Sequence, residues 1–114
     1  MIHSKNNSEH YTWGDHCDSW ILKNTGNLSV KQEKMPAGTS EKLHFHKVAE
    51  QFFYILKGEA VLYINEEKFL VQKGESVSIE PGSKHFISNE SDEEIEFLVI
   101  SNPPAEYDRI EIKE

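Results

Sequence analysis

A stretch with two histidines, residues 38–58, constrains this chain more than any other part of the sequence. It begins and ends with glycine, and it contains His44 and His46 in the order His-Phe-His, followed by an apolar segment from Gln51 to Leu56. Residues i and i+2 of a β-strand point to the same face of a sheet, so both imidazoles are expected on one side. Two imidazoles on one side form half of a metal site.

Two further residues would complete such a site. Gln51 is expected on the same face of its strand as Phe53 and Ile55, and if this face meets the imidazoles, the Gln51 amide adds an oxygen donor. His85 follows a Pro-Gly turn at the start of another strand-like segment and offers a fourth ligand. This interpretation predicts a metal site and a pocket wall, with His44, His46, Gln51 and His85 as ligands and Phe53 and Ile55 on the wall.

The spacing of these residues resembles the two sequence motifs of the cupin superfamily. The first motif has Gly, five residues, His-x-His, three or four residues, Glu, six residues and Gly, and the chain fits it from Gly38 to Gly58 with Gln51 in the glutamate position. The second motif has Gly, five residues, Pro-x-Gly, two residues, His, three residues and Asn. The chain matches it with Glu80 in place of the first proline and with Gly74, Gly82, His85 and Asn89.

The resemblance implies an all-β fold, a single-domain cupin jelly roll or double-stranded β-helix barrel. The sequence agrees, because short β-branched and aromatic segments alternate with Gly or Pro turns and show no helical period. We expect one domain over residues 1–114, with an N-terminal arm and ornament at 1–27, a barrel core at 28–102 and a tail at 103–114.

Composition excludes several classes of function. The chain has 114 residues, enough for one domain, and a formal net charge of -8, with 20 acidic against 12 basic residues. Nucleic-acid binding depends on clustered Lys and Arg, so no nucleic-acid partner is expected. A single cysteine cannot form an internal disulfide, and no apolar segment is long enough for a membrane span or signal peptide. We therefore expect a cytoplasmic protein without a membrane partner.

Glu50 is the alternative to Gln51 as a ligand. A regularly alternating strand turns Glu50 away from the histidines, and choosing Glu50 leaves seven residues before Gly58 where the motif has six. A β-bulge at the start of the strand would reverse this choice. With Gln51, all four ligands are neutral, so a divalent ion keeps its full charge and favours Lewis-acid chemistry. The ligand types do not select among Zn, Ni, Mn, Fe and Cu.

Three functions are compatible with these features. The first is a metal-dependent isomerase, lyase or dioxygenase that acts on a small polar molecule such as a sugar or a hydroxy- or keto-acid. The second is a cupin that binds or senses a small ligand without catalysis, and the third is a barrel in which the ion is only structural. A homodimer is expected in each case, because the outer face of the strand after the first motif carries Phe52, Tyr54 and Leu56.

Overall fold

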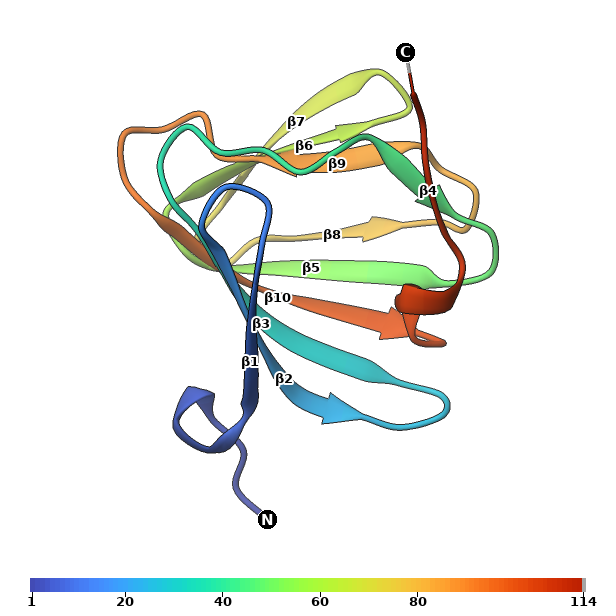
Figure 1. The fold of residues 1–114 in the computed structure, drawn as a ribbon. Coiled ribbons are helices and arrows are strands. Elements are labelled where there is room, and N and C mark those ends of the chain that lie inside the picture. The colour runs from blue at the N-terminus through green and yellow to red at the C-terminus, as the bar shows by residue number, and fades with distance from the viewer. Residues whose placement is uncertain (114) are drawn as a thin grey trace.

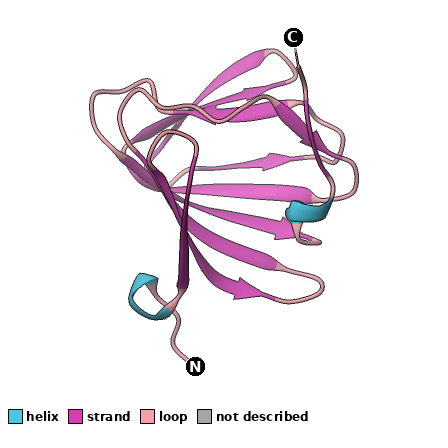
Figure 2. Cartoon of the chain, viewed as in Figure 1, coloured by secondary structure: helices cyan, strands magenta, loops and turns pink. Residues whose placement is uncertain are grey.

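The computed structural model describes residues 1–113, and nearly all of its regular structure is strand (Figures 1 and 2). Segments rich in β-branched and aromatic residues form these strands, as their propensities favour. Two single-turn 3-10 helices, η1 (Lys5–Asn7) and η2 (Ala105–Tyr107), lie near the ends of the chain. The strands are β1 (Glu9–Trp13), β2 (Cys17–Asn24), β3 (Ser29–Met35), β4 (His44–His46), β5 (Glu50–Lys57), β6 (Glu59–Ile64), β7 (Glu67–Gln72), β8 (Ser76–Ile79), β9 (His85–Ser88), β10 (Ile95–Asn102) and β11 (Arg109–Glu111).

The strands form two antiparallel sheets, which confirms the prediction of an all-β fold. One sheet has the order β1-β2-β3-β10-β5-β8, and the other has the order β11-β4-β9-β6-β7. Figure 1 shows the sheets facing each other, with β4 and β9 of the second sheet opposite β5 and β10 of the first. Each of the two sequence motifs therefore spans both sheets: β4 and β9 pair in the second sheet, and β5 and β8 pair in the first.

The interior changes from apolar to polar along the length of β10. Its buried, inward-facing residues are Ile95, Phe97, Val99 and Ser101, in alternation with partly exposed ones. Ile95, Phe97 and Val99 belong to the hydrophobic core, whereas Ser101 pairs with Ser29 on one side and Gln51 on the other. The apolar end anchors the barrel, and the polar end is available for a site.

The N-terminal 27 residues, expected to form an arm and ornament, contain two full strands. β1 and β2 extend the first sheet beyond β3. Gly14, with a φ of +52°, lies in the turn between β1 and β2. The sequence did not predict these strands, since their polar and apolar residues do not alternate cleanly.

The outer face of β5 carries three apolar residues in alternation, Phe52, Tyr54 and Leu56. Phe52 and Tyr54 are 37% and 36% exposed, and Ile100 and Leu98 of β10 pair with them. No helix among residues 1–113 is long and apolar enough to cross a membrane. The homodimer that this face suggests stays a prediction.

Candidate metal centre and cavity

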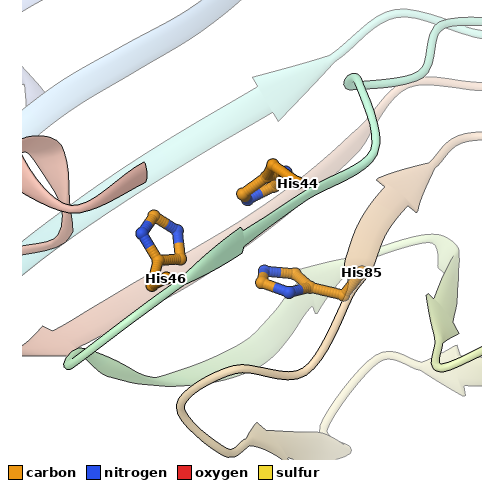
Figure 3. A group of neighbouring side chains, drawn as sticks. All are labelled: His44, His46 and His85. Atoms are coloured by element: carbon orange, nitrogen blue, oxygen red, sulfur yellow. The ribbon is translucent and has the colours of Figure 1, made fainter. Parts of the chain in front are cut away.

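Three histidines meet at the polar end of the interior. His44 and His46 project from β4, and His85 projects from the start of β9, where it pairs with His44 (Figure 3). Each offers a ring nitrogen within 4.8 Å of the nitrogens of the other two, and the side chains are almost completely buried. This grouping has the ligand types and the closeness that a divalent metal requires.

Each ring is held through its Nδ1 atom by an acceptor. The Nδ1–H of His44 donates to the Lys42 carbonyl at 2.7 Å, and that of His85 donates to the Ser83 carbonyl at 2.9 Å. The Nδ1–H of His46 donates to Oδ1 of Asp108 at 3.0 Å. These contacts fix the tautomer that leaves Nε2 with a free lone pair in all three rings.

The environment keeps the imidazoles neutral. Burial, with the neighbouring His85 as the next cause, lowers the pKa of His44 to about 3, and burial lowers the pKa of His85 to about 4. Burial also lowers the pKa of His46, although Asp108 opposes this effect. Nε2 of His46 is buried and has no hydrogen-bond partner within residues 1–113. A buried lone pair without a donor fits a metal ion, and so does the whole donor set.

Gln51 lies beside the histidines. Its Oε1 is 3.0 Å from Nε2 of His85, and its amide nitrogen donates to Oγ of Ser101 at 3.0 Å. Since His85 carries its proton on Nδ1, the facing atoms Oε1 and Nε2 both present lone pairs. Glu50, the alternative residue, is exposed on the opposite face of β5. The structure thus brings His44, His46, His85 and Gln51 together and leaves Glu50 outside.

A cavity of about 550 Å³ opens beside this cluster. His44, His46, Gln51 and Phe53 line it. Ile55, which the sequence also placed on the wall, does not line the cavity, because it is completely buried in the hydrophobic core beside Phe97. Of the two predicted wall residues, Phe53 therefore lines the cavity and Ile55 does not.

The C-terminal segment contributes to the site, which the sequence analysis missed. Asp108 accepts from the His46 ring through Oδ1, and its Oδ2 accepts from the backbone N–H groups of Val48 and Ala49 at 2.9 and 2.8 Å. Burial would raise the pKa of Asp108, but these donors hold it below its usual value. An ionised Asp108 therefore orients His46 and fixes the loop between β4 and β5.

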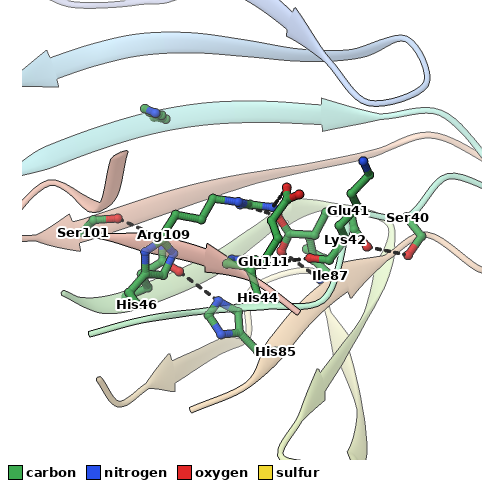
Figure 4. Close-up of polar contacts among 12 residues, drawn as sticks. Ser40, Glu41, Lys42, His44, His46, His85, Ile87, Ser101, Arg109 and Glu111 are labelled. Atoms are coloured by element: carbon green, nitrogen blue, oxygen red, sulfur yellow. Dashed lines mark hydrogen bonds and ion pairs between the residues drawn. The ribbon is translucent and has the colours of Figure 1, made fainter. Parts of the chain in front are cut away.

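Arg109 follows Asp108 and lines the cavity. It pairs with His46 in the β11–β4 ladder, and its guanidinium lies 3.6 Å from Glu41 and 3.6 Å from Glu111 (Figure 4). Burial raises the pKa of Glu41 to about 7, although the Arg109 charge opposes this shift. The alternating segment Arg-Ile-Glu was the only signal in the sequence for this strand, and its pairing partner lies more than 60 residues away.

A second group of polar residues lines the cavity from the N-terminal strands. Nζ of Lys31 on β3 donates to the hydroxyl of Tyr11 on β1 at 2.9 Å. Glu33, two residues further along β3, also lines the cavity, and burial raises the pKa of its carboxyl. The sequence does not indicate these three residues, because the segment 1–27 reads as an arm and ornament and residues 28–35 alternate imperfectly.

Comparisons with known proteins identify relatives of this chain. The sequence profile of the cupin domain matches residues 31–101. An uncharacterized protein of Methanocaldococcus jannaschii is 34% identical over 86 residues, which is 75% of this chain and 69% of that protein. An oxalate-binding protein of Thermotoga maritima is 33% identical over 67 residues, which is 59% of this chain and 55% of that protein. The match thus spans little more than half of the oxalate-binding protein.

A solved structure shows the same architecture. The crystal structure of a predicted oxalate decarboxylase from Thermotoga maritima superposes with a TM-score of 0.83 over 91% of this chain and 100% of that chain, at 21% sequence identity. The shared architecture confirms that the two facing sheets form the jelly-roll barrel that the sequence motifs implied. By its profile match, its relatives and its fold, this chain belongs to the cupin domain family.

Proposed function

We propose that this chain is a divalent-metal-dependent cupin enzyme that acts on a small polar molecule, a sugar or a hydroxy- or keto-acid, in the cavity beside the histidines. The observation that carries this proposal is the set of three neutral imidazoles whose Nδ1 atoms all have acceptors and which each offer a ring nitrogen within 4.8 Å of the others. A divalent ion held there supplies Lewis-acid polarisation of a substrate oxygen. Its identity among Zn, Ni, Mn, Fe and Cu is left open by the ligand types.

His44, His46, His85 and Gln51 are the proposed ligands. None of them carries a charge in the state that binds a cation, so the site keeps the full charge of the ion. Asp108 supports the ligands indirectly, because its carboxylate orients the His46 ring and strengthens the ring as a donor. In this proposal the protein side chains hold the ion in a fixed geometry, and the substrate occupies the adjoining cavity.

The cavity supports a small-molecule substrate. Its volume of about 550 Å³ lies in the usual range for small-molecule sites, and Phe53 gives it an apolar wall beside the histidines. Arg109 places a positive charge at the same cavity, which favours a substrate with a carboxylate. The name of the oxalate-binding relative agrees with a carboxylic acid as the ligand class.

Metal binding is tested by thermal melting of chelator-treated protein with and without added Zn²⁺. We expect Zn²⁺ to raise the melting temperature, because an ion that binds only the folded state stabilises it. His44→Ala should abolish this increase, whereas His16→Ala, at an exposed position away from the cluster, should retain it. A sample that contains bound metal but melts identically after chelation would contradict a specific site.

A non-catalytic binding protein is the second candidate. It is favoured by Phe53, an apolar residue on the wall nearest the ligands, and by the name of the oxalate-binding relative. Incubation of the Zn²⁺-loaded protein with hydroxy- and keto-acids, followed by NMR of the mixture, separates the two. New product signals support the enzyme, and line broadening of the added acid without product supports the binding protein.

A further inference from the structure

The cavity has a second polar wall away from the histidine cluster. We call it the distal wall and define it by Tyr11 on β1 and Lys31 and Glu33 on β3. All three line the same cavity as His44 and His46. None of them belongs to the two sequence motifs, so the wall is not part of the metal-ligand set.

Strand register places the distal wall at some distance from the ligands. Ser29 pairs with Ser101, and Ser101 pairs with Gln51, so these three form one row across the first sheet. Glu33 lies two inward-facing positions further along β3, roughly 13 Å at the usual rise of a strand. Both ends carry side chains that project into the cavity. A ligand that contacts both must therefore be longer than a two-carbon acid.

The distal wall has unused hydrogen-bonding capacity. Lys31 uses one N–H to bind the Tyr11 hydroxyl, which leaves two N–H donors on Lys31 and the O–H donor of Tyr11. Within residues 1–113, no donor lies in hydrogen-bonding or ion-pair geometry with the Glu33 carboxyl. Ser19 lies opposite Glu33 on β2 and influences its pKa, but the Ser19 hydroxyl has no partner in hydrogen-bonding geometry among these residues. Donors and an acceptor thus face the same cavity.

The charges of the distal wall select for a neutral polar group. Glu33 and Lys31 offer groups of opposite kind here, so a carboxylate placed there has Glu33 beside it and an ammonium group has Lys31 beside it. A hydroxyl group satisfies both sides, because it donates to a Glu33 carboxyl oxygen and accepts from Lys31 or Tyr11. Hydroxyls are therefore the groups whose hydrogen bonds this wall completes.

We propose that Tyr11, Lys31 and Glu33 form a second ligand subsite, which binds the hydroxyl groups of a polyhydroxy carboxylic acid whose acid end lies at the histidine cluster. The proposal rests on the proposed function, since the histidine cluster must hold the acid end. It narrows the ligand class from small polar molecules in general to acids with a hydroxylated chain. Oxalate, with two carbons and no hydroxyl, would reach only the histidine end.

The test compares two acids that share the same 2-hydroxy-carboxylate end. Glycolate has this end alone, and D-gluconate extends it with a hydroxylated chain. Calorimetric titration of the Zn²⁺-loaded protein, dialysed free of excess metal, gives a Kd for each acid, and D-galactonate serves as a second hydroxylated acid. We expect a hydroxylated acid to bind at least tenfold more tightly than glycolate, the difference that one hydrogen bond to a charged group provides.

Variants of the distal wall then locate the difference. Glu33→Gln and Tyr11→Phe should each reduce the preference for the hydroxylated acid about tenfold and leave glycolate binding unchanged. Glu67→Gln removes an equal charge at an exposed position on β7 and should keep the preference. Thermal melting in the presence of Zn²⁺ identifies any variant that does not fold. If Glu33→Gln does not fold, Tyr11→Phe, which removes only one oxygen, supplies the test.

The outcomes separate this subsite from the proposed function. Equal binding of glycolate and both hydroxylated acids, or a preference that both wall variants retain, overturns the subsite and leaves the metal-dependent function standing. Binding of none of the acids to protein that is loaded with Zn²⁺ overturns the subsite and the proposed ligand class together. A preference that falls in Glu33→Gln and Tyr11→Phe but not in Glu67→Gln supports the subsite.

Discussion

The side-chain oxygen of Gln51 lies 3.0 Å from Nε2 of His85, although both atoms present lone pairs. The His85 ring cannot donate from Nε2, because its proton is on Nδ1 and is bound to the Ser83 carbonyl. Two facing acceptors repel each other unless a cation lies beside both. This contact supports the proposal that Gln51 and His85 bind the same metal ion.

The first prediction concerns residues 50 and 51. Gln51→Glu should retain or tighten divalent metal binding, because it places a negative charge next to the ion. Glu50→Gln should change metal affinity little, since Glu50 is exposed on the other face of β5. Zn²⁺ titration of both variants beside the unmodified protein measures the difference. A large loss of Zn²⁺ affinity in Glu50→Gln, with no change in Gln51→Glu, would show that Glu50 rather than Gln51 faces the histidines.

The second prediction concerns Asp108. Asp108→Ala removes the acceptor of the His46 Nδ1 proton and of two backbone N–H groups. Loss of such an outer partner typically lowers metal affinity about 10- to 100-fold, which we expect here. Competition with a chromogenic chelator gives the affinity. Asp92→Ala, in an exposed loop, is the matched control, and equal affinities in the two variants would show that Asp108 does not support the site.

The difference between Gln51 and Asp108 shows what sequence could predict. The proposed ligands on β4 and β5 follow from a local rule, because alternate residues of a strand share a face, and His85 follows from its motif. Asp108 and Arg109 reach the site only because β11 pairs with β4, and Asp108 is 62 residues from His46. Nothing local in a charged segment indicates such a pairing. The prediction that Ile55 lines the cavity was wrong for a related reason. Alternation gives the face of the strand on which a residue lies, but not how far along the strand the cavity extends.

The third prediction concerns the pH dependence of the metal-free protein. The folded state holds His44 and His85 with a pKa of about 3 and about 4, whereas the unfolded chain protonates them near the ordinary value of about 6.5. The unfolded state therefore binds more protons below this value, and the free energy of unfolding should fall as pH decreases from about 6.5 to about 4. Each histidine contributes up to about 1.4 kcal/mol per pH unit.

Glu41 acts in the opposite direction in this pH range. Burial raises its pKa to about 7, so the folded state binds its proton more readily than the unfolded state, and stability from this group is lost as pH rises through 7. The contribution of the three histidines to the pH dependence of stability exceeds that of this one carboxyl, so a net fall is expected. Urea unfolding of chelator-treated protein at several pH values should show the fall, and Glu41→Gln should make it steeper. Constant stability from pH 6.5 to 4.5 in both proteins would contradict the neutral, buried histidines.

The fourth prediction concerns Gly58, in the turn between β5 and β6. Its φ is +80°, and a Cβ atom there would lie 2.9 Å from Cγ2 of the buried Ile95. Gly58→Ala should therefore lower the free energy of unfolding by roughly 2 kcal/mol or more, from backbone strain and overpacking together. Gly26→Ala is the control, because no atom lies within 4 Å of its added Cβ. Equal urea midpoints for the two variants would show that Ile95 can move aside.

The last prediction concerns assembly. Phe52 and Tyr54 are more than one third exposed on the outer face of β5, beside Ile100 and Leu98 of β10. Monomers seldom leave such a contiguous apolar face in water, so we expect a dimer by light scattering at micromolar concentration. Phe52→Glu should produce the monomer mass, because it buries a charge in the contact, while Phe69→Glu on β7 tests an exposed aromatic residue elsewhere and should leave the dimer intact. A monomer mass for the unmodified protein would refute the dimer. Dissociation by Phe69→Glu but not by Phe52→Glu would show that the dimer contact lies at β7, the edge of the second sheet.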